Sequence, residues 1–207
     1  MIDTVTVVPG DLTEDLLDEL TRAGEVAWDI ETTGLDWREG RIGTCQLYSR
    51  ATGAVLIQVQ QVRPRRLVQL LADPTVLKVF HHAPFDLSWM MGHWRTEAVS
   101  VACTKVASRL LEPQADRGTH TLQRLVQHNL GFQLDKTERL SDWTSDNLTA
   151  AQIRYAAQDV EYLLPLLEVL TKRLTHRDQL ATYRRCLDYL PTRILFDINN
   201  WPDVFSY

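Results

Sequence analysis

The sequence contains, at residues 25–35, the stretch Glu25-Val26-Ala27-Trp28-Asp29-Ile30-Glu31-Thr32-Thr33-Gly34-Leu35. Apolar residues recur at every second position before the Thr-Thr-Gly turn, which predicts a β-strand over 25–31. In such a strand Asp29 and Glu31 point to one face, and Trp28 and Ile30 point to the other. Two carboxylates on an apolar strand repel each other and are costly to desolvate, and a cation removes that cost. Oxygen ligands suit Mg²⁺ or Mn²⁺. The alternative is a solvated strand end with two surface acids.

A second acidic motif follows an apolar segment at 77–80 and reads His81-His82-Ala83-Pro84-Phe85-Asp86-Leu87. The apolar segment is expected to be a strand, and a helix is expected to open at Pro84, which places Asp86 in the first helical turn. Taken alone, an acid at this position is explained by the helix dipole. Paired histidines also occur in zinc sites, but no third nitrogen or sulfur ligand follows at a useful spacing.

The third motif, Tyr155-Ala156-Ala157-Gln158-Asp159, lies in a segment expected to be helical over 149–173, with Pro165 kinking or splitting that helix. Tyr155 and Asp159 are four residues apart and therefore share one helix face. The small alanines between them allow another element to approach closely. Taken alone, the pattern is also explained by an amphipathic helix with a tyrosine at the edge of the core.

The rest of the chain predicts a mixed sheet covered by helices, because strands come first and the second half is nearly all helical. Further strands are expected at 41–48, 53–59 and 98–102, the first two joined as a hairpin. Further helices are expected at 11–23, 64–71, 84–91, 104–111, 121–129 and 176–187. Residues 188–207 are expected to pack back on the domain. No repeat or composition break divides the chain, so we expect a single domain over 1–207.

The composition argues against several classes of protein. The net charge of −5 is a mild argument against a protein that depends on phosphate contacts, but bound cations reverse the charge of a carboxylate site. The three cysteines are widely spaced and form no C-x-x-C pair, which argues against a disulfide framework or a thiolate zinc site. No segment approaches the roughly 18 apolar residues of a membrane span. No basic and apolar leader is present either, so we expect a cytoplasmic location without a membrane partner.

Together and in this order, the three motifs resemble the DEDD exonucleases, in the Tyr-bearing branch that includes ribonuclease D. The segments 103–111, 135–137 and 140–143 are also similar to ribonuclease D, so the resemblance covers roughly residues 20 to 175. It implies an α/β, RNase H-like exonuclease fold, with a mixed β-sheet flanked by helices and a helical C-terminal half. One position departs from the family pattern, because His82 stands where the family usually carries Asn, four residues before Asp86.

The resemblance implies a two-metal 3′→5′ exonuclease that releases nucleoside 5′-monophosphates from a single-stranded 3′ end, with RNA expected rather than DNA. The implied ligands of two divalent cations, Mg²⁺ or Mn²⁺, are Asp29, Glu31, Asp86 and Asp159. Tyr155 is expected to orient the attacking water, because a phenol with a pKa near 10 is a poor base at neutral pH. The sequence gives no indication of the oligomeric state.

The resemblance also implies a pocket for the terminal nucleotide. Its expected residues are Ile30, Thr32, Thr33, Gly34, Leu35, His82 and Phe85, with Lys136 as a phosphate contact. Phe85 is equally well explained as part of the core. Further candidates for phosphate contacts are Lys105, Arg109 and Arg139, and the densest basic cluster is Arg63, Arg65 and Arg66. Long ribonuclease D proteins carry helical nucleic-acid-binding modules after this domain, and none is expected within these residues.

Three alternatives remain open at this point. The first is a DNA 3′→5′ exonuclease, since the contacts to a 2′-OH that separate RNA from DNA come from less recognisable positions. The ribonuclease D-like segment at 135–143 favours RNA. The second is a catalytically inactive nucleic-acid-binding module on the same scaffold. The third is an RNase H-like endonuclease, which Tyr155 disfavours by its place four residues before Asp159.

Overall fold

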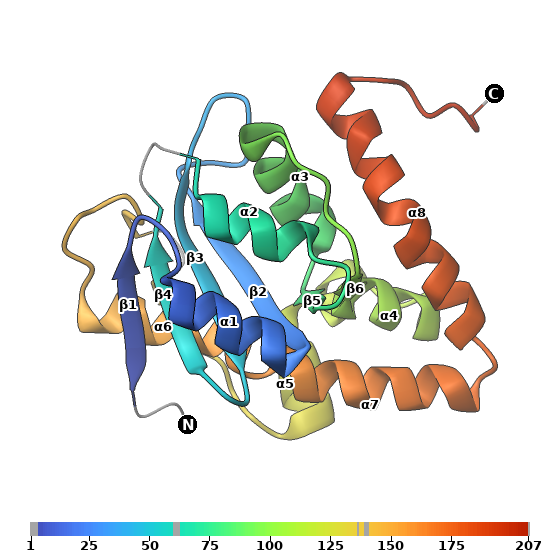
Figure 1. The fold of residues 1–207 in the computed structure, drawn as a ribbon. Coiled ribbons are helices and arrows are strands. Elements are labelled where there is room, and N and C mark those ends of the chain that lie inside the picture. The colour runs from blue at the N-terminus through green and yellow to red at the C-terminus, as the bar shows by residue number, and fades with distance from the viewer. Residues whose placement is uncertain (1–3, 60–62, 136, 139–140, 207) are drawn as a thin grey trace.

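A computed structural model describes residues 4–59, 63–135, 137–138 and 141–206 of the chain. Within these residues the strands form one six-stranded sheet. Figure 1 shows helices packed on both faces of this sheet. The strands are β1 (Val5–Pro9), β2 (Glu25–Thr32), β3 (Ile42–Ser49), β4 (Gly53–Gln58), β5 (Leu77–Phe80) and β6 (Val101–Cys103). The helices are α1 (Glu14–Ala23), α2 (Arg65–Ala72), α3 (Ala83–Trp94), α4 (Thr104–Leu111), the 3₁₀ turn η1 (Arg117–His120), α5 (Leu122–Leu130), α6 (Ala150–Glu161), α7 (Leu163–His176) and α8 (Leu180–Asn199).

The sheet is mixed, and β2 lies in its interior. The strand order is β1-β4-β3-β2-β5-β6. β3 pairs antiparallel with both β2 and β4, while β5 pairs parallel with β2 and β6. β1 pairs parallel with β4 at the sheet edge, and the sequence did not predict it. Its apolar alternation is faint because only Val8 of this edge strand is buried.

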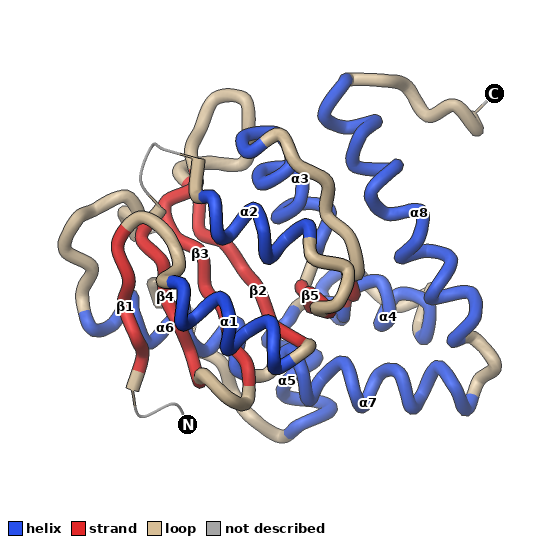
Figure 2. Tube along the Cα trace, in the orientation of Figure 1, coloured by secondary structure: helices blue, strands red, loops and turns tan. Residues whose placement is uncertain are grey.

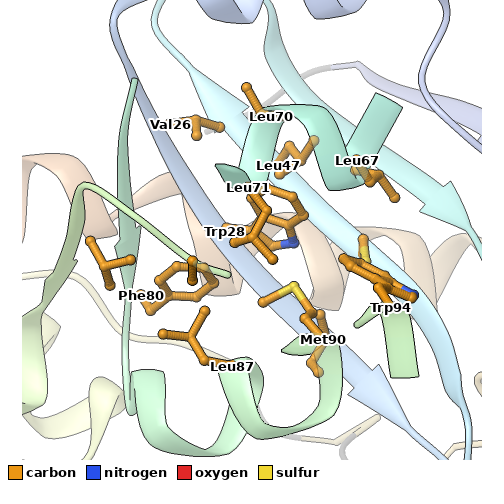
Figure 3. Close-up of a cluster of buried hydrophobic side chains, with 14 of the residues drawn as sticks. Val26, Trp28, Leu47, Leu67, Leu70, Leu71, Phe80, Leu87, Met90 and Trp94 are labelled. Atoms are coloured by element: carbon orange, nitrogen blue, oxygen red, sulfur yellow. The ribbon is translucent and has the colours of Figure 1, made fainter. Parts of the chain in front are cut away.

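Helices cover the two faces of the sheet in separate layers, as the tube in Figure 2 also shows. One layer contains α1, α2, α3 and α8, whose apolar side chains form one cluster with Val26, Trp28 and Ile30 of β2. Figure 3 shows Trp28 at the centre of this cluster, among Leu71, Phe80 and other apolar side chains. The other layer contains α4, α5, α6 and α7. None of the described helices combines the length and the apolarity that a bilayer crossing requires.

The sequence predicted that the second half is helical, but it did not predict where the last two helices begin and end. The expected long helix is split at Tyr162, and Pro165 lies in the first turn of α7, where a backbone N–H is not needed. α8 is longer than expected, because it continues through Pro191 as far as Asn199. Leu190 and Ile194 of this extension are buried against the layer that contains α3, so residues 188–199 do pack back. The expectation was wrong for residues 200–206, which are all exposed.

Candidate active site

The acidic face of β2 is the base of the candidate site. Asp29 and Glu31 are half-buried and lie opposite Gln46 and Thr44 of β3, whose side chains share their face. The sequence did not single out these two polar neighbours. The register shifts between Glu31 and Thr32, and such a bulge bends a strand away from its partner. The chain therefore turns out of the sheet directly after its second acid.

α6 brings the third motif to the same face. The helix begins with a capping box, in which the Thr149 hydroxyl accepts from the Gln152 N–H at 3.2 Å and the Gln152 side chain accepts from the Thr149 N–H at 2.9 Å. Ala156 is fully buried, and its small side chain lets the helix lie close to β3 and β4. Tyr155 and Asp159 are both buried on the sheet side, which confirms the predicted shared face.

Three of the four predicted acids meet at one point. One carboxylate oxygen from each of Asp29, Glu31 and Asp159 lies within 4.8 Å of the other two. Like charges at this separation destabilise one another, and a divalent cation with oxygen ligands compensates them. The donor set contains only oxygen atoms, which suits Mg²⁺ or Mn²⁺ rather than zinc. The residues present therefore match the divalent cation that the sequence led us to expect.

Asp86 adjoins this cluster from α3 but is not one of its three members. β5 pairs with β2 only as far as Ala27 and Val79. The first turn of α3 lies beyond that point, and the backbone of Ile30 hydrogen-bonds the Asp86 carboxyl. Asp86 is 2% exposed, and its pKa is raised well above the ordinary value, mainly by burial and then by the charge of Asp29. A cation beside it would favour the ionised form.

Tyr155 lies beside the acids and stays protonated at neutral pH. Its pKa is raised by burial first and then by the negative charges of Asp159, Glu31 and Asp29, and its phenol hydrogen-bonds Asp159. The ring packs against buried Trp143, with centroids 5.7 Å apart. Trp143, at the end of the ribonuclease D-like segment 140–143, thus supports the tyrosine.

The segment that carries Trp143 is seated on β3 at Gly43. A Cβ atom at this glycine would lie 2.5 Å from the Trp143 carbonyl oxygen, so no other residue fits without moving the backbone. Gln58 of β4 holds the following residues, since its Nε2 donates to the carbonyls of Ser145 at 3.3 Å and Asp146 at 3.1 Å. β3 and β4 thus fix the position of Trp143, on which Tyr155 packs.

Positive side chains gather on the α3 and α4 side of the acids. The pKa of His82 is lowered by burial and then by the charges of Lys105 and Arg109, which therefore lie near its ring. The pKa of Lys105 is lowered mainly by burial, and its charge also interacts with Asp86. His82 adopts a left-handed backbone conformation with φ 75°, which Asn and His adopt more readily than most residues. The backbone thus accounts for His at a position where Asn is usual.

The predicted nucleotide pocket is brought together in part. Thr32 Oγ1 donates to the Gly34 carbonyl at 2.7 Å, and Leu35 is 88% exposed at the tip of the turn. Thr33 is exposed in the same turn. The Phe85 ring is half-buried and nearly parallel to that of His82, at a centroid distance of 6.5 Å and 10°.

Other residues of the expected pocket lie elsewhere or outside the structure. The side chain of Ile30 is buried in the core on the opposite face, so only its backbone is turned to the acids. Lys136 and Arg139 lie outside the described residues. Arg65 and Arg66 lie in the first turn of α2, where the Arg66 backbone N–H donates to Asp11 at 2.8 Å.

A carboxylate cluster of this kind, on a mixed α/β sheet and beneath a tyrosine, is typical of a divalent-metal-dependent nuclease. Residues 4–175 match the family described as 3′-5′ exonuclease, and the chain belongs to that family. Ribonuclease D of Haemophilus influenzae is 30% identical over 149 residues, which are 72% of this chain and 37% of that protein. The chain thus spans little more than a third of the length of this curated relative.

Two solved structures are similar over nearly their whole length. Brucella melitensis NrnC with bound Mg²⁺ is 34% identical with a TM-score of 0.89, covering 99% of both chains. Brucella melitensis NrnC bound to pGG is also 34% identical with a TM-score of 0.89, covering 99% of this chain and 98% of that one. These matches confirm the expected RNase H-like exonuclease fold, and the family is one that depends on divalent metal.

Proposed function

We propose that the protein is a divalent-metal-dependent 3′→5′ exoribonuclease that shortens single-stranded RNA and releases nucleoside 5′-monophosphates. The observation that carries this proposal is the meeting of Asp29, Glu31 and Asp159 within 4.8 Å, beside Tyr155. Membership of the 3′-5′ exonuclease family supports the reaction. Similarity to ribonuclease D and to NrnC bound to pGG supports RNA, including RNA as short as a dinucleotide. Similarity to NrnC with bound Mg²⁺ supports Mg²⁺ as the working ion.

Different residues bind the cations and orient the attacking water. Asp29, Glu31, Asp159 and Asp86 would hold the cations, which would supply a nucleophilic water at neutral pH and would stabilise the charge on the attacking and leaving oxygens. Tyr155 holds the water by hydrogen bonding and does not take its proton, because its raised pKa keeps the phenol neutral.

The remaining contacts place the strand. The exposed turn at 32–35 meets the terminal nucleotide, since it follows Glu31 directly and presents Leu35 outward. Lys105 and Arg109 attract the phosphates on the opposite side, where their charges lie near His82 and, for Lys105, near Asp86. A local positive edge of this kind resolves the mismatch between an acidic chain and a polyanionic substrate.

The direct test is a time course on 5′-labelled single-stranded RNA, matched DNA and a 5′-phosphorylated diribonucleotide, each with Mg²⁺, Mn²⁺ or EDTA. We expect a metal-dependent ladder that shortens by single nucleotides from the 3′ end, with RNA degraded faster than DNA. A faster rate on DNA would identify a DNA exonuclease instead. Internal cleavage would contradict the exonuclease polarity, and the absence of both cleavage and Mn²⁺ binding would indicate an inactive nucleic-acid-binding module.

A matched pair of variants assigns the activity to this site. Asp29→Asn keeps the side-chain shape and removes one charge from the cluster, so its activity should be lost. Asp18→Asn makes the same change at an exposed acid on α1 and should behave as the wild type. Size-exclusion chromatography with light scattering in the same experiment determines the oligomeric state, for which the described chain gives no prediction.

A further inference from the structure

The turn at 32–35 continues into a longer loop, and we call residues 33–41 the substrate loop. Its base is closed by two hydrogen bonds, because the Thr33 N–H donates to the Arg41 carbonyl at 3.1 Å and the Arg41 N–H donates to Thr33 Oγ1 at 2.9 Å. A Cβ atom at Gly40 would lie 2.6 Å from the Trp89 ring of α3, so the base also presses on that helix. The loop therefore has little freedom where it joins the sheet.

The middle of the substrate loop is seated on α3 through Trp37. A Cβ atom at Gly92 would lie 2.6 Å from the Trp37 ring, so this glycine provides the surface on which the indole lies. The ring meets His93 edge-on at a centroid distance of 6.0 Å. Trp37 is packed against the same apolar cluster as Trp28. The helix that supplies Asp86 thus also carries the substrate loop.

Arg38 joins the substrate loop to the far end of the chain. Its Nη2 donates to the Asp197 carbonyl at 2.7 Å, to Asn200 Oδ1 at 2.7 Å and to the Ile198 carbonyl at 3.4 Å. These groups form the C-terminal end of α8, where the last carbonyls and the helix dipole favour a cation. The guanidinium carbon also lies 4.8 Å from the centroid of the Trp37 ring. In Figure 1 the loop after β2 and the end of α8 lie at the same end of the molecule.

We propose that Arg38 is a positioning residue for the terminal nucleotide, and that the end of α8 is the anchor through which it acts. This inference rests on the proposed exonuclease function. By holding Trp37 and the adjacent turn against α3 and α8, Arg38 fixes the place of the exposed Leu35 relative to Glu31. The side chain of Arg38 is held by Asp36, Trp37 and the end of α8, so its removal should weaken the hold on the nucleotide and leave the cation site intact.

The experiment compares Arg38→Ala with wild type on RNA and on bis(p-nitrophenyl) phosphate, a phosphodiester without base or sugar. Loss of hydrogen bonds from a charged group should raise KM for RNA by about tenfold while kcat stays within about threefold. Hydrolysis of bis(p-nitrophenyl) phosphate and the affinity for Mn²⁺ should not change, because neither depends on the substrate loop. Arg38→Lys should recover part of the loss, since an ammonium can reach one of these acceptors but not all of them.

Two further variants separate positioning from general stability. Asn200 has a left-handed backbone with φ 54°, which glycine tolerates, so Asn200→Gly removes one acceptor without straining the helix end. It should raise KM for RNA by about threefold. Arg50→Gln, at an arginine that pairs with Glu25 and Glu168 on the surface, serves as the control and should change nothing.

The outcomes are distinct. A wild-type KM for RNA in Arg38→Ala, or an equal fall in turnover of both substrates, would overturn the positioning role while the exonuclease function stands. Absence of RNA hydrolysis by the wild-type protein would overturn the proposed function and this inference with it. A raised KM on RNA alone, partly recovered by lysine and repeated weakly by Asn200→Gly, is the result that the geometry predicts.

Discussion

The two faces of β2 meet opposite environments although their side chains alternate along one strand. On one face Val26, Trp28 and Ile30 are packed into the largest apolar cluster of the described chain. On the other face Asp29 and Glu31 approach Asp159 of α6 closely enough to repel it. The first face stabilises the fold, and the second costs stability until a cation binds. One short segment therefore carries both the support of the site and its chemistry.

The packed face of β2 explains what holds the acids in place. A strand that is held by its neighbours on both sides and by a packed apolar face cannot rotate to expose its carboxylates to water. Burial and then the charge of Asp29 raise the pKa of Asp86. This carboxyl is therefore protonated more readily, which lowers the repulsion among the acids. Four changes test this division between the faces.

The largest effect is expected on the acidic face. Asp29→Asn should lower kcat/KM on RNA by about a thousandfold or more, because it removes a cation ligand. The same change should raise the free energy of unfolding in EDTA by about 1 kcal/mol, because it relieves the repulsion from Glu31 and Asp159. Steady-state kinetics and thermal unfolding measure the two effects. Turnover within tenfold of wild type would show that the acids are not the site.

A change on the apolar face of β2 should lower stability and leave cation binding intact. Trp28 is fully buried and stacks on Phe80 with ring centroids 6.1 Å apart. Trp28→Ala should lower the free energy of unfolding by about 3–5 kcal/mol through the cavity it leaves. The folded fraction should retain its affinity for Mn²⁺. The matched change at Trp201, which is 55% exposed, should cost less than about 1 kcal/mol in chemical denaturation. Equal losses at both positions would argue against the packing described for β2.

A change at Tyr155 should have an effect of intermediate size. Tyr155→Phe keeps the ring packed on Trp143 and removes the hydroxyl that bonds Asp159. We expect kcat to fall by about 10- to 100-fold with little change in KM or in Mn²⁺ affinity, because an orienting group is lost and no ligand is. Tyr189→Phe, at an exposed tyrosine of α8, is the control. An unchanged kcat would remove Tyr155 from the mechanism.

The smallest effect concerns a charge buried away from the site. Lys78 of β5 is buried, and its ammonium donates to the Asp73 carbonyl at 2.5 Å. Burial lowers its pKa from 10.5 to about 8, so above pH 8 the unfolded chain binds a proton that the folded chain does not. Stability should therefore rise by roughly 1–2 kcal/mol between pH 8 and pH 9.5, measured by urea unfolding. The rise should be absent in Lys78→Met, and a rise of the same size in that variant would assign it to other groups.

The sequence predicted the parts of the fold that have a strong local period. The alternation around Trp28 identified β2 and the separation of its faces, and the spacing of Tyr155 and Asp159 identified the face of α6. The faint pattern of β1 and the continuation of α8 through Pro191 were missed, because pairing with β4 and burial of Ile194 decide them. Local propensity gives way to tertiary contacts in both cases.

The meeting of Asp29, Glu31 and Asp159 was predicted from the sequence, whereas the residues that support them were not. Asp86 comes beside Asp29 only because β5 stops short and α3 begins there. Gly43 and Arg38 were not singled out as supports, since the partners that explain them lie far away in the chain, at Trp143 and at the end of α8. A local sequence pattern cannot predict long-range contacts of this kind.

The order of the ligands along the chain has a consequence for its synthesis. Asp29 and Asp159 are 130 positions apart, and Asp159 lies on a helix that docks only after most of the sheet is complete. Chains emerge from the ribosome N-terminus first, so β2 is made long before α6. During that interval the acids of β2 lack Asp159 and Tyr155. If these residues act as proposed, the nascent protein stays inert toward RNA, including the message being translated, until α6 has been synthesised.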